Sequence, residues 1–300
     1  MSSRVVVAGI GVLDQVWELP SLPPAPGKYI AAGLRVTGGG MAATAAVAIS
    51  ALGGKAAWCG RLGTDAVADS LLSRLRQHGV DTRGVSITPG ARSPSSGVLV
   101  DRGGERILAV FPGSGLPENA PIPEHLLDNA GAVLADPRWI GGAERLFALA
   151  AARGLPRVLD ADIAPPGVLR RLAPQADHVI FSQRGLADYA GTDDPARGLA
   201  LTVETLRGSV AVTLGAAGSL WWRGGRAVPV PAPQIAARDT TGCGDVFHGA
   251  YALALAEGLT PDSAAPFATA AAALKAERGE GWDGMPDRVA VESMLSKLWR

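Results

Sequence analysis

Short apolar runs alternate with segments of helical periodicity through most of the chain, and this alternation predicts an α/β fold. The strand-like runs include residues 5–8, 132–135, 157–160, 178–181 and 210–214, and the helical segments include residues 66–79, 142–153, 166–172, 246–256 and 262–276. A succession of such βα units favours a doubly wound, mainly parallel sheet with flanking helices. Ligands of such folds bind at the carboxyl ends of the strands.

Two stretches depart from this alternation, because each pairs strand-like runs without a helix between them. Residues 16–19 and 29–36 flank the proline-rich turn 20–26, and residues 96–100 and 106–111 flank the turn 101–105. Hairpin patterns of this kind predict a small β-sheet lid. We therefore expect a large α/β domain of residues 1–12, 38–93 and 113–300, and a lid of residues 13–37 and 94–112.

The stretch from Arg238 to Ala250 has the composition of a loop that enters a helix. Gly242 and Gly244 flank Cys243, and their lack of a Cβ lets the backbone approach an anion, which the amides and dipole of a helix start attract. Asp245 follows directly, and a carboxylate beside a transferring phosphoryl group is able to accept the proton of an attacking hydroxyl. Glycine turns and first-turn aspartates are also common structural features, so the spacing alone leaves both interpretations open.

Composition narrows the classes of function. The 300 residues are 47% hydrophobic and 19% charged with a formal net charge of zero, which fits a globular protein and argues against a nucleic-acid partner. The N-terminal apolar run is too short for a membrane span and lacks a signal-peptide pattern, so no membrane partner is expected. Two distant cysteines and four scattered histidines indicate neither a disulfide framework nor a histidine metal site, and a cytoplasmic location is expected.

Polar groups at the ends of predicted strands are further candidates for a site. The chain has no P-loop motif, and residues 9–14 lack the third glycine of a dinucleotide fingerprint. Asp14 follows the first strand, and Asp136, Arg138 and Asp162 follow two later ones. Arg138 is suited to binding an anionic group on a substrate. It is equally suited to an ion pair with Asp136 or Asp162.

The sequence Asp239-Thr-Thr-Gly-Cys-Gly-Asp-Val-Phe resembles the C-terminal signature of the ribokinase-like (PfkB) carbohydrate kinases, which usually have alanine at the position of Cys243. The resemblance extends in order over almost the entire chain. It implies an ATP-dependent sugar kinase in which Asp245 is the catalytic base and the amides of Gly242, Cys243 and Gly244 form the anion hole.

The glycine turn before residue 41 and the small-residue helix after it are similar to the family's N-terminal signature. This similarity implies that Gly39 and Gly40 approach the sugar and that Asp14 contacts its hydroxyls. Thr44 is also placed at the sugar, where many members have an asparagine. That difference argues against a ribose-like substrate.

Thr213, Gly215 and Gly218 form a Thr-x-Gly-x-x-Gly segment that resembles the nucleotide-binding segment of the family, and a simple hairpin is the alternative. With Gly242 and Gly244, they are the expected ATP contacts. Mg²⁺ is expected to arrive with the nucleotide phosphates, and a monovalent cation such as K⁺ is a further candidate cofactor. Residues 182–185 replace the Asn-x-x-Glu motif that many members use for magnesium, so the protein ligands of a metal are unassigned.

The segments around Lys28, Thr44, Arg138 and His248 resemble one branch of the family, the sulfofructose kinases. The resemblance implies 6-deoxy-6-sulfofructose or a related ketose as the acceptor, with Lys28 and Arg138 facing the sulfonate, and a homodimer formed through the lid. Val110 stands where this branch would be expected to have a polar sulfonate contact. The alternatives are a kinase of ribose, fructose, 2-keto-3-deoxygluconate or adenosine type, and a sugar-binding regulator without catalysis.

Overall fold

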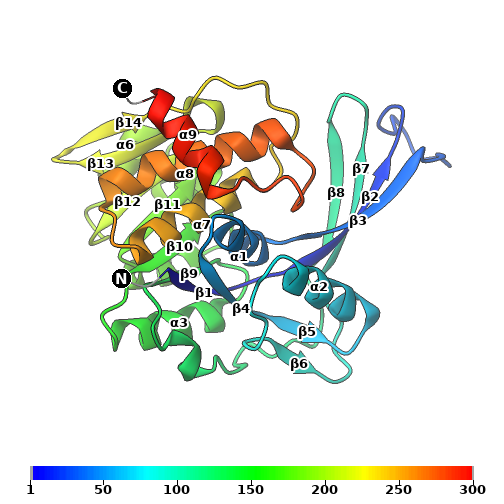
Figure 1. Cartoon of the computed structure of the whole chain (residues 1–300), viewed down its shortest axis with the longest axis horizontal. Coiled ribbons are helices and arrows are strands. Elements are labelled where there is room, and N and C mark those ends of the chain that lie inside the picture. Colours follow the sequence, from blue (N-terminus) through cyan, green and yellow to red (C-terminus); the bar gives the residue numbers. More distant parts are fainter. Residues whose placement is uncertain (1–2, 299–300) are drawn as a thin grey trace.

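The computed structural model describes residues 3–298, which form a large sheet, a smaller separate sheet and a short two-stranded one (Figure 1). The large sheet has eight strands in the order β14-β13-β12-β11-β10-β9-β1-β4. These strands are β1 (Arg4–Ala8), β4 (Lys55–Cys59), β9 (Ala132–Ala135), β10 (Arg157–Ala161), β11 (His178–Ser182), β12 (Ser209–Thr213), β13 (Ser219–Arg223) and β14 (Arg226–Val230). All neighbours from β4 to β12 pair in parallel, and β13 and β14 add an antiparallel hairpin at one edge. The predicted mainly parallel α/β sheet is confirmed.

Helices cover both faces of the large sheet and enclose a separate apolar core on each face. One core contains residues of α1 (Met41–Ala51), α2 (Ala66–Gln77), α7 (Cys243–Ala256), α8 (Pro261–Arg278) and α9 (Arg288–Leu298). The other contains residues of α3 (Ile140–Ala151), α4 (Val168–Leu172), α5 (Gln183–Ala190) and α6 (Pro195–Thr202). Successive strand side chains point to opposite faces, which is why Val5 and Val7 belong to the first core and Val6 and Ala8 to the second.

The small residues of α1 allow α7 to pack unusually close to it. Every residue from Ala42 to Ile49 is buried. A Cβ on Gly249 of α7 would lie 2.5 Å from the carbonyl oxygen of Ala45, so only glycine fits at this crossing. A Cβ on Gly242 would lie 3.1 Å from Thr44 Cγ2, so the start of α7 is held against α1. The packing of two helices thus positions the candidate glycine turn.

The smaller sheet, which we call the lid, stands apart from the large sheet on the right of Figure 1. Its strands are β2 (Val12–Glu18), β3 (Gly33–Gly39), β7 (Ser95–Val100) and β8 (Arg106–Phe111), in the order β3-β2-β7-β8. A third sheet, formed by β5 (Arg61–Gly63) and β6 (Ser86–Thr88), was not predicted from the sequence. No helix in the described part of the chain is both long and apolar enough to cross a membrane.

The second lid strand begins later than its apolar pattern predicted. It was expected from residue 29, but β3 starts at Gly33, which pairs with Glu18, the last residue of β2. Residues 29–32 belong to the loop between these strands, and Ile30 is 84% exposed. The prediction was wrong here because a strand needs a partner, and β2 ends before residue 29 reaches one.

Candidate active site

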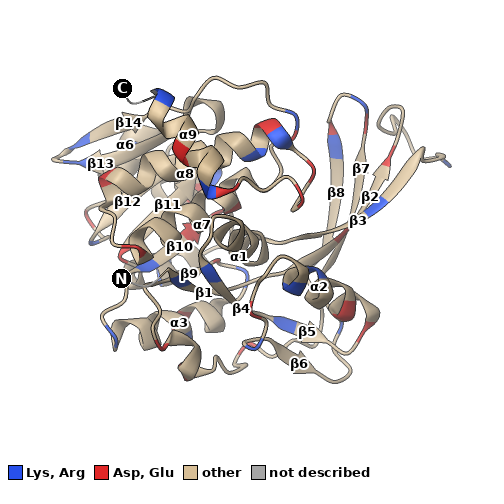
Figure 2. Cartoon of the chain, in the orientation of Figure 1, with Lys and Arg blue, Asp and Glu red and all other residues tan. Residues whose placement is uncertain are grey.

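A cavity of about 1200 Å³ lies between the inner face of the lid and the body of the protein. Its walls include the starts of α1 and α7, the end of α8 and the loop that follows α8. Figure 2 shows a basic segment on β8 and charges of both signs near the end of α8, on the two sides of this space. Seven of the predicted site residues line the cavity: Asp14, Gly39, Gly40, Thr44, Arg138, Gly242 and Asp245.

The start of α7 combines a glycine turn with a carboxylate. Gly242 is the N-cap residue and has a φ of 73°, a left-handed conformation that favours glycine. A Cβ on Gly242 would lie 3.7 Å from Asp245 Oδ2, so the carboxylate stands directly beside the turn. A Cβ on Gly244 would meet no atom within 4 Å, so space for a ligand remains next to this backbone.

The amides at this helix start differ in their availability. The amide of Cys243 donates to the carbonyl oxygen of Thr240 at 3.3 Å, so it is engaged in a turn rather than free as the sequence suggested. The His248 ring, one turn further along α7, has its Nδ1 2.7 Å from the carbonyl oxygen of Gly244 and its Nε2 3.2 Å from that of Ile180. This ring connects the first turn of α7 to the middle of β11.

Asp245 lies in a group of carboxylates that oppose its ionisation. Burial raises its pKa well above the usual aspartate value, and the charges of Asp136, Asp162 and Asp14 act in the same direction, whereas Arg138 lowers it. A raised pKa makes this carboxylate a stronger base than an exposed one. The geometry and the electrostatics therefore both suit proton acceptance at the cavity wall.

Asp14 is held in place by the pairing of the lid strands. Asp14 on β2 stands opposite Ser96 on β7, and Ser96 Oγ donates to Asp14 Oδ1 at 2.5 Å. A Cβ on Gly39 would lie 2.1 Å from Asp14 Oδ2, so any larger residue would displace this carboxylate. Burial raises the pKa of Asp14, although the hydrogen bond from Ser96 and the charge of Arg35 oppose the shift. Ser96 was not predicted as a site residue, because the register that brings it to Asp14 is not visible in the sequence.

Gly40 and Thr44 shape the entry into α1. Gly40 has a φ of 88°, and a Cβ there would lie 2.7 Å from the carbonyl oxygen of Ile10. Thr44 Oγ1 accepts a hydrogen bond from Trp282 Nε1 at 3.0 Å. A Cβ on Gly38 would collide with the ring of Trp282 at 2.1 Å. Trp282, which lies in the loop after α8 and was not predicted, therefore closes one side of the cavity.

Asp136 supports the site without facing a substrate. It is 1% exposed, and it accepts hydrogen bonds from the amides of Ile10 at 2.8 Å, Ala42 at 3.1 Å and Arg138 at 2.8 Å. These bonds tie β1, α1 and the end of β9 together. The Arg138 guanidinium is 3.7 Å from Asp162 Oδ2, and its side chain, which lines the cavity, is 36% exposed. This contact matches one of the ion pairs that the sequence left open.

The lid touches the loop that precedes α7. Arg106 on β8 donates from Nη1 to Asp239 Oδ1 at 3.2 Å, and the same nitrogen contacts Thr241 Oγ1. Asp239 also accepts from the Thr241 amide at 2.8 Å. The lid is thus joined to the glycine turn by a charged contact across the cavity mouth.

Six predicted residues do not line this cavity, and two of them, Cys243 and Gly244, belong to the start of α7. Lys28 lies exposed in the loop between β2 and β3. Thr213 ends β12 and donates to the carbonyl oxygen of Phe181 at 3.3 Å. Gly215 begins an exposed 3₁₀ turn, and Gly218 is buried where a Cβ would lie 2.2 Å from the carbonyl oxygen of Val230. The last three occupy the carboxyl edge of the large sheet, beside the end of β11.

The protein ligands of a metal were left unassigned by the sequence. No group of three or more histidine, cysteine, aspartate or glutamate side chains within residues 3–298 is arranged to bind a metal ion. Where the family motif has asparagine and glutamate, Ser182 caps α5 by accepting from the Gly185 amide at 3.0 Å. A Cβ on Gly185 would lie 2.2 Å from the carbonyl oxygen of Ala161, so a glutamate would not fit there. We therefore assign no side chain to Mg²⁺.

Comparison with known proteins gives consistent matches over nearly the whole chain. The model of the "pfkB family carbohydrate kinase" matches residues 3–288. The ribokinase of Bacillus subtilis is 25% identical over 297 residues, which are 98% of this chain and 99% of that protein. The fructokinase of Klebsiella pneumoniae is 29% identical over 285 residues, 89% of each chain.

A solved structure from Agrobacterium tumefaciens, provisionally described as a ribokinase, superposes on this chain with a TM-score of 0.94. It is 33% identical in sequence, and the match covers 99% of this chain and 98% of that one. The ribokinase-like fold that the sequence resemblance implied is therefore confirmed.

Proposed function

This chain belongs to the pfkB family of carbohydrate kinases, and on that premise we propose that it transfers the γ-phosphate of ATP to a primary hydroxyl of a sugar. The observation that carries the proposal is the position of Asp245, which lines the cavity directly beside the glycine turn of α7. A base and an anion-binding backbone at one point are what an attacking hydroxyl and a transferring phosphoryl group require.

In the proposed reaction, Asp14 accepts hydrogen bonds from sugar hydroxyls while Gly39 and Gly40 leave room for the sugar beside it. Asp245 accepts the proton of the attacking hydroxyl as its oxygen bonds to the γ-phosphorus of ATP and the bond to ADP breaks. The amides of Gly242 and Gly244 stabilise the charge on the transferring group. The lid limits the access of water, which reduces simple hydrolysis of ATP.

The nucleotide is proposed to lie along the carboxyl edge of the large sheet. Thr213, Gly215 and Gly218 are at this edge, and the start of α7 faces the same side. Mg²⁺ bound to the phosphates of ATP would neutralise part of their charge. The chain's own contribution in this proposal is the glycine backbone of α7 and Asp245.

For the acceptor we propose a ketose with an anionic group, such as 6-deoxy-6-sulfofructose. Arg138 supports this choice, because its partly exposed side chain lines the cavity and its ion pair with Asp162 is a loose 3.7 Å contact. Arg35 also lines the cavity from β3. Val110, 52% exposed on β8, and Lys28, outside the cavity, do not contribute to anion binding in this arrangement.

A panel of acceptors tests this choice. ADP release would be measured with 6-deoxy-6-sulfofructose, fructose, ribose, 2-keto-3-deoxygluconate and adenosine, each with ATP and Mg²⁺. The proposal expects the highest kcat/KM for the sulfonated ketose, and expects Arg138→Met to lower kcat/KM for it more than for fructose. A higher kcat/KM for a neutral sugar, unaffected by Arg138→Met, would remove the anionic acceptor and leave the kinase assignment standing.

The pH profile of the reaction should depend on Asp162. Asp245 must be ionised to accept a proton, so activity is present above its pKa and is lost as the pH falls through it. Since Asp162 raises the pKa of Asp245, Asp162→Asn should move the acidic limb of kcat to lower pH. The release of Arg138 from Asp162 acts in the same direction. The exposed residue Asp188 provides the control, Asp188→Asn, which should leave the limb in place; an unmoved limb in Asp162→Asn would contradict the assignment.

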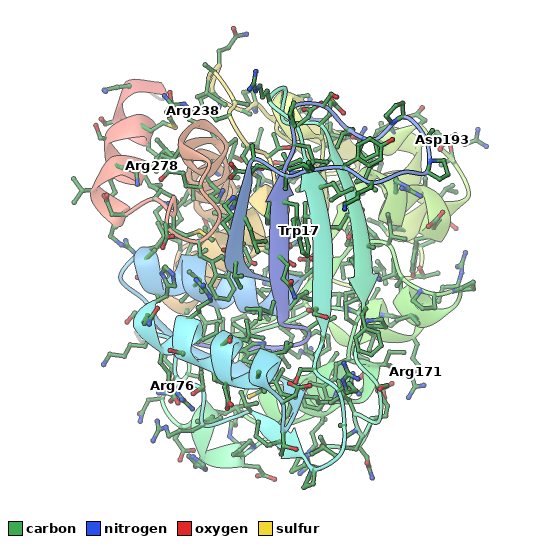
Figure 3. The ribbon with its side chains drawn as sticks, turned by 90° about the vertical axis from the view of Figure 1, so that its right-hand side faces the viewer. Trp17, Arg76, Arg171, Asp193, Arg238 and Arg278 are labelled. Atoms are coloured by element: carbon green, nitrogen blue, oxygen red, sulfur yellow. The ribbon has the colours of Figure 1, made fainter. Side chains whose placement is uncertain are left out.

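The outer face of the lid supports the proposal of a homodimer. One row of paired apolar residues crosses its four strands and consists of Leu34, Trp17, Leu99 and Ile107. Leu34 is 59% exposed and Ile107 is 47% exposed, and Figure 3 looks onto this face, with Trp17 labelled at its centre. An apolar row of this kind on an open sheet is suited to a second copy of the chain.

Light scattering after gel filtration tests the dimer. The wild-type protein should have twice the 30.6 kDa mass of one chain, and Ile107→Glu should have that of a monomer. Leu201→Glu, at an exposed leucine of α6, introduces the same charge away from the lid and should leave the dimer intact. A monomeric wild-type protein would refute this proposal.

A further inference from the structure

Lys275 is a fully buried lysine that the proposed mechanism does not use. It lies near the end of α8, its residue is 1% exposed, and it borders the cavity. Buried lysines are rare because removing an ammonium group from water is costly unless it finds partners. Its Nζ donates to the carbonyl oxygen of Gly279 at 3.1 Å, and within residues 3–298 it has no ion pair at 4.0 Å or less.

The surroundings of this ammonium group are those of a cation site. The C-terminal end of α8 carries the negative end of the helix dipole, and the Gly279 oxygen adds a direct contact. Asp239 is nearby: burial opposes its ionisation, but hydrogen bonds from Thr241 and the charges of Lys275 and Arg106 leave its pKa below the usual value. The positive charge therefore has three sources of stabilisation: a dipole, a carbonyl and a carboxylate.

The same place connects α8 to the loop that precedes the glycine turn. The amides of Arg238 and Asp239 donate to the carbonyl oxygen of Ala276 at 2.8 and 3.2 Å. A Cβ on Gly279 would lie 3.4 Å from Asp239 Cβ, so the two segments are in direct contact. The position of the loop, and with it the start of α7, therefore depends on the end of α8.

We propose that the Lys275 ammonium is a built-in cation that holds residues 238–244 in position, and that the kinase therefore needs no external K⁺ at this place. The sequence left a monovalent cation as a candidate cofactor, but the residues here do not fit one, since the ammonium already contacts the Gly279 carbonyl. Lys275 acts as a positioning residue: it fixes the backbone that binds the phosphoryl group and adds a positive charge behind it. This role depends on the proposed kinase activity, whereas the cation site itself does not.

Cation exchange on the wild-type enzyme is the first test. Sugar-dependent ADP release would be compared in KCl and in tetramethylammonium chloride at equal ionic strength. Tetramethylammonium is too large for a site built to hold an ammonium group. The proposal expects kcat and the KM for ATP to agree within about twofold between the two salts. The loss of one electrostatic contact would change them by more than this. A loss of activity in tetramethylammonium that K⁺ restores would overturn it.

Removal of the ammonium is the second test, and it has a readout that does not require turnover. Lys275→Ala empties the site, so K⁺ or NH₄⁺ should raise its melting temperature above the value in tetramethylammonium chloride, whereas the wild type should show no such difference. Arg278→Ala removes a charge from the same helix end but leaves Lys275 in place, so it should also show no difference. Absence of a K⁺-specific or NH₄⁺-specific rise in folded Lys275→Ala would overturn the proposal.

Activity completes the comparison. Lys275→Ala in tetramethylammonium chloride should lose about 10- to 10²-fold in kcat/KM for ATP, and K⁺ or NH₄⁺ should restore a part of this loss. If Lys275→Ala does not fold, Lys275→Met replaces it in the assay, because methionine preserves the length of the side chain. Lys275→Met should show the same loss in kcat/KM for ATP, and K⁺ or NH₄⁺ should not restore it. Full activity of Lys275→Met would overturn the proposal. If the wild type phosphorylates no sugar, the kinase proposal fails, and the melting experiment still decides the cation site.

Discussion

Replacing Asp245 with asparagine should lower kcat by about 10²- to 10⁴-fold, the range associated with the loss of a general base. Asparagine has nearly the same shape as aspartate, so the start of α7 should keep its geometry beside Gly242. The amide does not accept a proton from the sugar hydroxyl, and this is the step that the carboxylate supplies. Steady-state kinetics with the best acceptor of the panel, together with calorimetric measurement of sugar binding, would separate catalysis from affinity.

The sugar affinity of Asp245→Asn should change little, because Asp14 carries the proposed contacts with the hydroxyls. Asp262 provides the control: it also lies in the first turn of a helix, α8, but its side chain is 72% exposed. Asp262→Asn should retain normal turnover. Near-normal turnover in Asp245→Asn would remove this residue from the role of base.

Replacing Gly39 with alanine should lower kcat/KM for the sugar by about 10²- to 10⁴-fold, which corresponds to two lost hydrogen bonds to a charged group. The added Cβ would lie 2.1 Å from Asp14 Oδ2, and Ser96 restrains the other carboxylate oxygen at 2.5 Å. Asp14 has a short side chain and little freedom to move aside, so the carboxylate must leave its position. The KM for ATP should stay within about twofold of the wild type, since the nucleotide binds elsewhere.

Gly97 is a matched position for this experiment. It lies on β7 of the same lid, and a Cβ there would be 3.7 Å from the Trp17 ring, an ordinary contact distance. Gly97→Ala should therefore retain the wild-type kcat/KM. An unchanged kcat/KM for the sugar in folded Gly39→Ala would show that Asp14 is not where the sugar binds.

The large sheet and the junction at α7 were predictable because their signals are local. The apolar runs at 132–135 and 157–160 are each followed by a predicted helical segment, and this order favours parallel neighbours. The helices α5 and α6 after the run at 178–181 were not predicted. The two glycines before Asp245 and the apolar period after it mark a helix start without reference to other parts of the chain. The family signature then supplied roles for residues that the spacing alone left open.

The parts that sequence reasoning missed depend on contacts between distant segments. Ser96 reaches Asp14 only through the parallel register of β7 with β2, and Trp282 reaches Thr44 across more than two hundred residues of chain. Lys275 was not predicted as a site residue, because its burial is a property of the packed structure and is not visible in the sequence. The early start expected for β3 failed for the same reason: an apolar run does not reveal where its partner strand ends.

The direct test of the account is to follow the phosphorus of ATP by ³¹P NMR while the enzyme acts on each acceptor of the panel. The account predicts that one sugar gives a new phosphomonoester signal, coupled to the two protons of a CH₂ group, which grows in step with ADP and is abolished in practice by Asp245→Asn. ATP that yields only inorganic phosphate, or that is not consumed with any sugar, would contradict it.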